Sequence, residues 1–145
     1  MNKLLFLLLL PILIYSDEYE FRGRHFLASY VDCDNDAISD PEMVRFIMDK
    51  AVSSSGATIL DSRYCQFGEL GGVTIVYLLA ESHASIHTYP EHNSVFVDIF
   101  TCGDSCTVSD FDAILQWYFK PKVTHALLLS RSKDIEELVL DCDLD

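Results

Sequence analysis

The chain has 145 residues, of which half are hydrophobic and 12% aromatic, a composition typical of a single globular domain and unlike that of disordered or fibrous proteins. It carries 23 acidic and 10 basic residues, a formal net charge of −13. Such a surface repels phosphate backbones and anionic lipid headgroups, so we expect neither nucleic acid nor a membrane surface as a partner. Cationic metabolites remain compatible with this charge.

A hydrophobic leader opens the chain. One lysine is followed by an apolar run from Leu4 to Tyr15, which is too short to span a bilayer and has the length of a signal-peptide core. Ile14 stands where signal cleavage prefers a small residue. We expect a signal-like or upstream segment at 1–20, a folded domain at 21–131, and an acidic tail at 132–145 that is solvated or forms a short helix.

Hydrophobic periodicity and turn residues divide the rest of the chain into strands and two helices. Pro41 and Gly56 bound the first helix, and Pro121 ends the second. The candidate N-caps are Ser39 or Asp40 and Ser109 or Asp110. The expected elements are a strand at 25–32, a helix within 39–56, strands at 57–67, 73–81, 83–89 and 94–100, a helix within 109–121, and a strand at 123–130.

This order, with a run of hairpins between two helices, predicts an α+β fold. A glycine-rich turn at 68–72 joins two of the strands into a hairpin. We expect a two-layer sandwich in which both helices cover one face of a mainly antiparallel sheet.

Chemically reactive side chains concentrate in the segment LLAESHASIHTYPEHNSVFVDIFTCG, residues 78–103. A metal site would use three histidines and a cysteine, of which two histidines share a strand face and the third lies in a turn. This ligand set is His83, His87, His92 and Cys102. The residue types are suitable, but their spacing is not distinctive of a metal site.

A nucleophile with a histidine base is the second interpretation of this segment. The nucleophile would be Ser82 or Cys102. Alternation along a strand puts Ser85 and His87 on the same face as His83. The third interpretation is that these side chains are polar residues of an edge strand without a catalytic role. The residue pattern alone leaves all three open.

The five cysteines form an odd set without a repeated C-x-x-C spacing, which argues against a zinc ribbon and a complete disulfide framework. Cys102 and Cys106 are close enough in sequence to form a bridge in an oxidising compartment. The remaining cysteines are expected to be buried and inert; they are Cys33, Cys65 and Cys142.

Four segments together carry a family resemblance: GRHFLASYVDCD at 23–34, GATIL at 56–60, AESHASIHTYPEH at 80–92, and VDIFTCG at 97–103. They resemble the bacterial-type S-adenosylmethionine decarboxylases, which are pyruvoyl-dependent enzymes of polyamine synthesis. The family pattern E-S-H-x-[ST]-I-H-T-W-P-E followed by F-T-C-G is kept, with Tyr89 in place of Trp. The similarity runs from about residue 23 to residue 130.

The resemblance implies that the chain cleaves itself between Glu81 and Ser82. The Ser82 hydroxyl would attack the carbonyl of Glu81, and β-elimination followed by hydrolysis would leave a pyruvoyl group at position 82. His87 matches the histidine that takes the α-proton. The cofactor would thus be made from Ser82, without pyridoxal phosphate and without a metal.

The resemblance also assigns the later steps. The pyruvoyl ketone would form a Schiff base with the amine of S-adenosylmethionine, and Cys102 would donate a proton after decarboxylation. Phe67 matches a family aromatic that stacks on adenine, and Glu91 a carboxylate that holds the ribose. The product would supply aminopropyl groups for spermidine, and the family implies a cytoplasmic homodimer of processed protomers.

The chain departs from the family pattern beside the cleavage site. Thr74 stands where the family has an assisting serine, and Ile75 replaces a glycine. One extra residue separates Phe67 from Thr74, and Ser29 lies where a carboxylate is common. The same fold and chemistry would also suit decarboxylation of ornithine or arginine. A non-enzymatic alternative is an exported binding domain with a Cys102–Cys106 bridge, which the hydrophobic leader would favour.

Overall fold

The computed structural model describes residues 21–138, which form one seven-stranded sheet with every adjacent pair antiparallel. The strand order is β2-β3-β4-β5-β1-β6-β7. The elements are β1 (Gly23–Val31), α1 (Asn35–Ile38), α2 (Pro41–Ser54), β2 (Ile59–Phe67), β3 (Gly72–Leu79), β4 (Ser82–Tyr89), the 3₁₀ turn η1 (Pro90–His92), β5 (Ser94–Thr101), α3 (Val108–Phe119), β6 (Val123–Arg131) and β7 (Ile135–Leu138).

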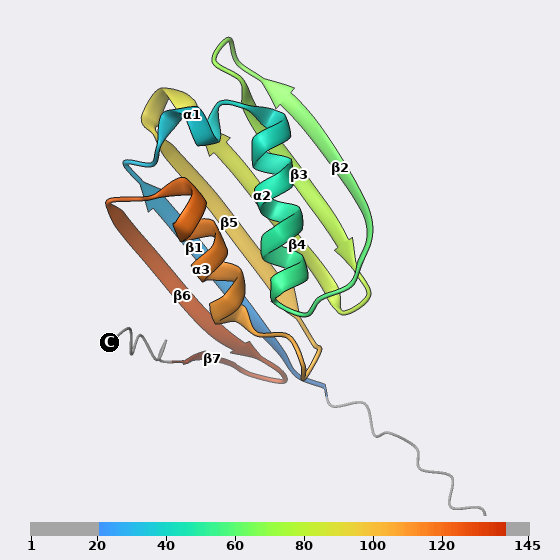
Figure 1. Cartoon of the computed structure of the whole chain (residues 1–145). Helices are drawn as coiled ribbons and strands as arrows, with labels where there is room; N and C mark the ends of the chain where they lie inside the picture. The colour runs from blue at the N-terminus through green and yellow to red at the C-terminus, as the bar shows by residue number, and fades with distance from the viewer. Residues whose placement is uncertain (1–20, 139–145) are drawn as a thin grey trace, which may run out of the picture.

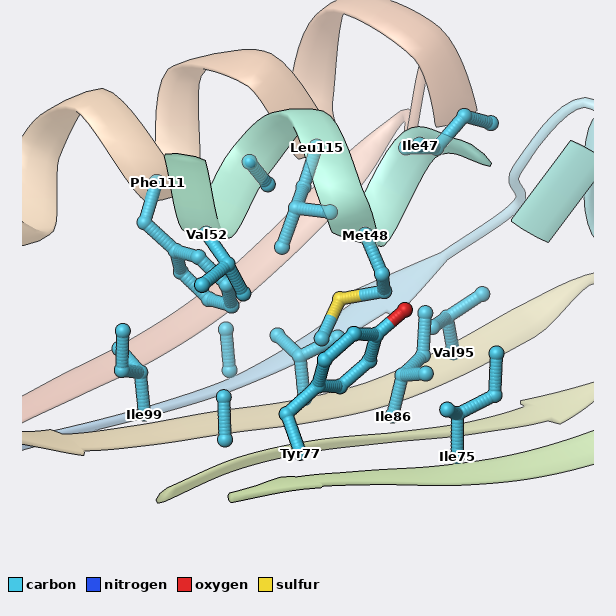
Figure 2. Packing of buried hydrophobic residues seen from close by; sticks show 14 of the residues in the cluster. Ile47, Met48, Val52, Ile75, Tyr77, Ile86, Val95, Ile99, Phe111 and Leu115 are labelled. Carbon is cyan, nitrogen blue, oxygen red and sulfur yellow. The ribbon is translucent and has the colours of Figure 1, made fainter. Parts of the chain in front are cut away.

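Helices α2 and α3 lie side by side across one face of the sheet, which confirms the predicted two-layer α+β sandwich (Figure 1). The core lies between these layers, where buried residues from both helices meet alternate side chains of β1, β3, β4 and β5 (Figure 2). Two buried tyrosines reach carboxylates on the helices: the hydroxyl of Tyr30 donates to Asp112, and that of Tyr77 donates to Asp49.

The predicted N-cap is confirmed for α2 but not for α3. Asp40 caps α2, because its carboxylate accepts hydrogen bonds from the first-turn N–H groups of Glu42 and Met43. The predicted cap of α3 at Ser109 or Asp110 was wrong, because that helix already begins at Val108. Its N-cap residue, Thr107, makes no side-chain cap; its N–H instead donates to the carbonyl of Ser55 at 2.8 Å. A contact with the end of α2 therefore sets where α3 begins.

The acidic tail also differs from the expectation in part. Residues Ile135–Leu138 form strand β7, which extends the sheet beyond β6 rather than forming a helix. Most of its side chains are exposed, as expected for a solvated tail. The hydrophobic leader lies outside the described residues, and so does Cys142. In the described part of the chain, no helix is both long and apolar enough to cross a membrane.

The sheet face opposite the helices, called the open face below, carries three cross-strand rows of side chains. Strand register defines them, because each residue lies directly opposite its partner. The first row is Asp61, Leu78, His83, Phe100 and His25; the second is Arg63, Val76, Ser85, Asp98 and Leu27; the third is Cys65, Thr74, His87, Phe96 and Ser29. Among the candidate residues from the sequence, His83 lies in the first row, Ser85 in the second, and Thr74 and His87 in the third.

Candidate active site

The tight connection between β3 and β4 holds Glu81 and Ser82 in a defined position. The carboxylate of Glu81 accepts a hydrogen bond from the N–H of Thr58 at 2.9 Å, and this bond is the main cause that lowers the pKa of Glu81. The N–H of Ala80 donates to the Thr58 carbonyl at 2.9 Å. Both bonds hold the chain on the N-terminal side of the Glu81–Ser82 peptide bond.

The backbone of Cys102 completes this end of the site. Its N–H donates to the Glu81 carbonyl at 3.2 Å, and its neighbour Thr101 is the cross-strand partner of Ser82. An N–H aimed at a carbonyl oxygen can stabilise the negative charge that develops there when a nucleophile attacks. The geometry thus places a nucleophile, its target carbonyl and an oxyanion donor together.

The loop after β5 reaches Glu81 only because residue 103 is glycine. A Cβ on Gly103 would lie 2.9 Å from Cγ of Glu81 and 3.0 Å from Sγ of Cys106, which is closer than side chains pack. Arg24 ties this loop to β1, because its guanidinium donates to the carbonyls of Gly103 and Cys106 at 3.1 and 2.7 Å. The close approach and these two bonds hold Cys102 beside the Glu81–Ser82 peptide.

A second group of side chains lies at the third row of the open face. Nδ1 of His87 is 2.6 Å from the hydroxyl of Thr74, its direct cross-strand partner. The ring of Phe67 stacks on His87, with ring centroids 4.6 Å apart and planes at 15°. Tyr89 also contacts His87, with centroids 4.4 Å apart. Thr74, His87 and Phe67, predicted separately from the sequence, therefore form one cluster.

Glycine at position 72 makes the Phe67 contact possible. A Cβ on Gly72 would lie 2.7 Å from the ring of Phe67, so any other residue would push the ring away from His87. Glu91 lies close along the chain, exposed in the turn η1 that follows Tyr89. The predicted adenine-side and ribose-side residues thus belong to the His87 end of the molecule.

The two groups do not meet within one chain. Ser82 and His87 are five residues apart in strand β4, a separation of roughly 16 Å at about 3.3 Å per residue. A cleft of about 480 Å³ includes Cys102, and a shallower cavity of about 410 Å³ on the open face includes His87. The lining residues of the two cavities do not overlap.

Two alternatives predicted from the sequence, the metal-ligand set and the disulfide, are not assembled in the described residues. His83 and His87 share a face but lie two rows apart, and His92 belongs to η1. Among residues 21–138, the group of side chains close enough to share a metal ion is His25, His83 and Asp98, and Cys102 is not in it. Cys102 and Cys106 are both free thiols, so the bridge of the non-enzymatic alternative is not present.

Sequence reasoning missed the residues that surround His83. His25 and Asp98 lie on neighbouring strands beside it, with a nitrogen or oxygen atom of each of the three within 4.8 Å of the others. A signal was available, because Asp98 interrupts the otherwise apolar and aromatic run of β5, and a charge there needs a partner. The contribution of Thr58 was not visible, since it acts through its backbone N–H.

Comparisons with known proteins agree with this arrangement. Residues 24–132 match the family described as S-adenosylmethionine decarboxylase. Proteins named S-adenosylmethionine decarboxylase proenzyme from Fervidobacterium nodosum and Archaeoglobus fulgidus are 36% and 39% identical over 111 and 109 residues. These alignments cover 77% and 75% of this chain and 80% and 96% of the relatives.

A solved structure extends the similarity to three dimensions. The crystal structure of the adenosylmethionine decarboxylase from Aquifex aeolicus superimposes with a TM-score of 0.72 at 35% sequence identity. The match covers 83% of this chain and 99% of that one. The chain described here belongs to the S-adenosylmethionine decarboxylase family.

Proposed function

We propose that this protein is a self-processing, pyruvoyl-dependent decarboxylase of S-adenosylmethionine that supplies the aminopropyl donor for spermidine synthesis. One observation supports the proposal in addition to family membership. The backbone carbonyl of Glu81, next to Ser82, accepts a hydrogen bond from the N–H of Cys102. A peptide held in this way between a hydroxyl and an oxyanion donor is poised for attack by its own serine.

Processing begins with attack of the Ser82 hydroxyl on the Glu81 carbonyl carbon. The Cys102 N–H stabilises the resulting oxyanion, and cleavage of the C–N bond converts the peptide into an ester. Removal of the α-proton of residue 82 by His87 then expels the Glu81 carboxylate by β-elimination. Tautomerisation to an imine and its hydrolysis release ammonia and leave a pyruvoyl group at position 82, with residues 1–81 as a separate chain.

The pyruvoyl carbonyl supplies an electron sink for decarboxylation of an amine-bearing substrate. The thiol of Cys102, whose backbone N–H bonds to the Glu81 carbonyl, donates a proton to the carbon that has lost carbon dioxide. Phe67 and Glu91 bind the adenosine part of the substrate through stacking and hydrogen bonds to the ribose. Thr74 orients the imidazole of His87 through their hydrogen bond at 2.6 Å.

The working unit in this proposal is a homodimer in which the open faces of two copies pack together. Within one chain His87 is roughly 16 Å from Ser82, so it must serve the Ser82 of the other copy. The open face supports this packing because it exposes apolar side chains where a solvated sheet face would be polar. Leu27, Val76, Leu78 and Phe96 are 37%, 49%, 55% and 49% exposed.

Intact-mass measurement of the purified protein tests the proposal. We expect two fragments that meet at Glu81–Ser82, with the second fragment blocked to Edman degradation, and a single chain for Ser82→Ala. Carbon dioxide release from S-adenosylmethionine, ornithine and arginine then identifies the substrate, and we expect release from S-adenosylmethionine. A wild-type chain that stays whole would rule out the enzyme.

A further inference from the structure

The residue that touches the Ser82 hydroxyl is His83, not His87. Nδ1 of His83 lies 3.0 Å from Oγ of Ser82, which is hydrogen-bonding distance. The first step of processing must remove the hydroxyl proton of Ser82, and within the same chain His87 is too far away to do so. His83 therefore occupies the position that a base for this first step requires.

The surroundings of His83 suit a ring that becomes positively charged for a short time. The carboxylate of Asp98 is nearby, in the group whose polar atoms lie within 4.8 Å of one another. Asp98 is three-quarters buried, and its other oxygen accepts the hydroxyl of Ser85. A partly buried carboxylate held in place by a hydrogen bond stabilises an adjacent imidazolium.

The contacts of His25 argue against a metal ion bound between His25, His83 and Asp98. The guanidinium of Arg131 lies 3.3 Å from Nδ1 of His25, and because a guanidinium only donates, Nδ1 must be the acceptor. The proton of the neutral ring is then on Nε2, which faces Asp98 at 3.6 Å. A metal ion could bind Nε2 of His25 only if that nitrogen carried no proton. The ion would also lie close to the positive charge of Arg131.

We infer that His83 is the catalytic base and acid of the first processing step, acting within its own chain. Its Nδ1 takes the Ser82 hydroxyl proton as Oγ bonds to the Glu81 carbonyl carbon, and Asp98 stabilises the imidazolium. The same proton then passes to the backbone nitrogen of residue 82 as the C–N bond breaks, which gives the ester and a free amine and restores neutral His83. This inference rests on the proposed self-cleavage; it divides that reaction between two histidines.

Pulse–chase synthesis of the precursor in a cell-free translation system tests this division. At chosen times hydroxylamine is added, which cleaves an ester at residue 81 but leaves the peptide whole. His83→Ala should slow ester formation by about 10²-fold or more, the usual contribution of a positioned general base. Free imidazole should restore part of the rate. His92→Ala is the matched control, because that exposed histidine lies outside both groups, and it should cleave like the wild type.

A second variant separates proton transfer from hydrogen bonding. His83→Gln keeps an acceptor near Ser82 but cannot carry a proton, so it should be as slow as His83→Ala. Ester formation at the wild-type rate in either variant would overturn the inference while leaving self-cleavage intact. Cleavage that EDTA abolishes and zinc restores would overturn it in favour of a metal site. A wild-type chain that is never cut would instead overturn the proposed function.

Discussion

The two ends of the open face differ in what they can do alone. Beside the first row, the Ser82 hydroxyl contacts His83 and the Cys102 N–H contacts the Glu81 carbonyl, so the groups required for the proposed ester formation all come from one chain. At the third row, Thr74 is hydrogen-bonded to His87 and Phe67 stacks on His87, but this group does not contact the Glu81–Ser82 bond. In the proposed mechanism one sequence motif therefore serves two sites, with ester formation within a chain and elimination across two chains.

Complementation between two variants tests this division most directly. His87→Ala alone should form the ester but no pyruvoyl group, a complete loss of decarboxylase activity. Co-expression with Ser82→Ala, which supplies an intact His87, should restore cleavage to the His87→Ala chains in mixed dimers, about half of them for random pairing. Mass spectrometry of differently tagged chains measures the cut fraction. If the two histidines both act in their own chain, mixing will restore nothing.

A charge in the middle row should prevent the open faces of two copies from packing together and so separate the two proposed reactions. Val76→Lys places an ammonium on β3 between the first and third rows, where a packed second sheet would have to desolvate it at a cost of several kcal/mol, of the order of ~3–5. We expect a monomer that forms the ester but does not eliminate, checked by sedimentation equilibrium and intact mass. Met43→Lys on α2, which is similarly exposed, is the control and should remain a processed dimer. A dimer that survives Val76→Lys would place the interface elsewhere.

The smallest expected effect is on the pH dependence of stability at the first row. Burial lowers the pKa of His25, although Asp98 opposes the shift. The unfolded chain then binds a proton more readily than the native one, so the native state loses stability as pH falls below the unfolded-state pKa of ~6.5. The loss is complete below the native pKa and absent at pH 8, where the ring is neutral in both states.

Thermal unfolding of the uncut Ser82→Ala chain between pH 8 and pH 5 measures this effect. Adding His25→Gln should reduce the loss of melting temperature on acidification, whereas adding His92→Gln should not. Identical pH profiles for all three chains would show that His25 does not contribute.

The sequence was a reliable guide wherever the information was local. Asp40, Pro41 and Gly56 predicted α2 because capping and turn chemistry act within a few residues. Alternation of apolar residues predicted the strands and hence the two-layer fold. The candidate site residues were identified through the family resemblance, and their roles stay predictions; the structure adds that Thr74, His87 and Phe67 lie in contact.

Other features depended on contacts that are distant in sequence. The start of α3 is set by the Thr107 bond to Ser55 and not by the polar residues that follow it. β7 forms because β6 leaves an edge whose backbone groups need partners. Neither feature has a local pattern of its own.

The amino-acid sequence alone identified the groups of the proposed chemistry: a serine after a glutamate, a histidine five residues on, and a cysteine directly after the following strand. Which of these groups lie together depends on the fold, because the rise of an extended strand puts His87 far from Ser82. Sheet register placed Cys102 and His83 beside Ser82, and Asp98 and His25 beside His83. The five-residue spacing between Ser82 and His87, which helps to identify the motif, therefore also keeps the two proposed reactions apart within one chain.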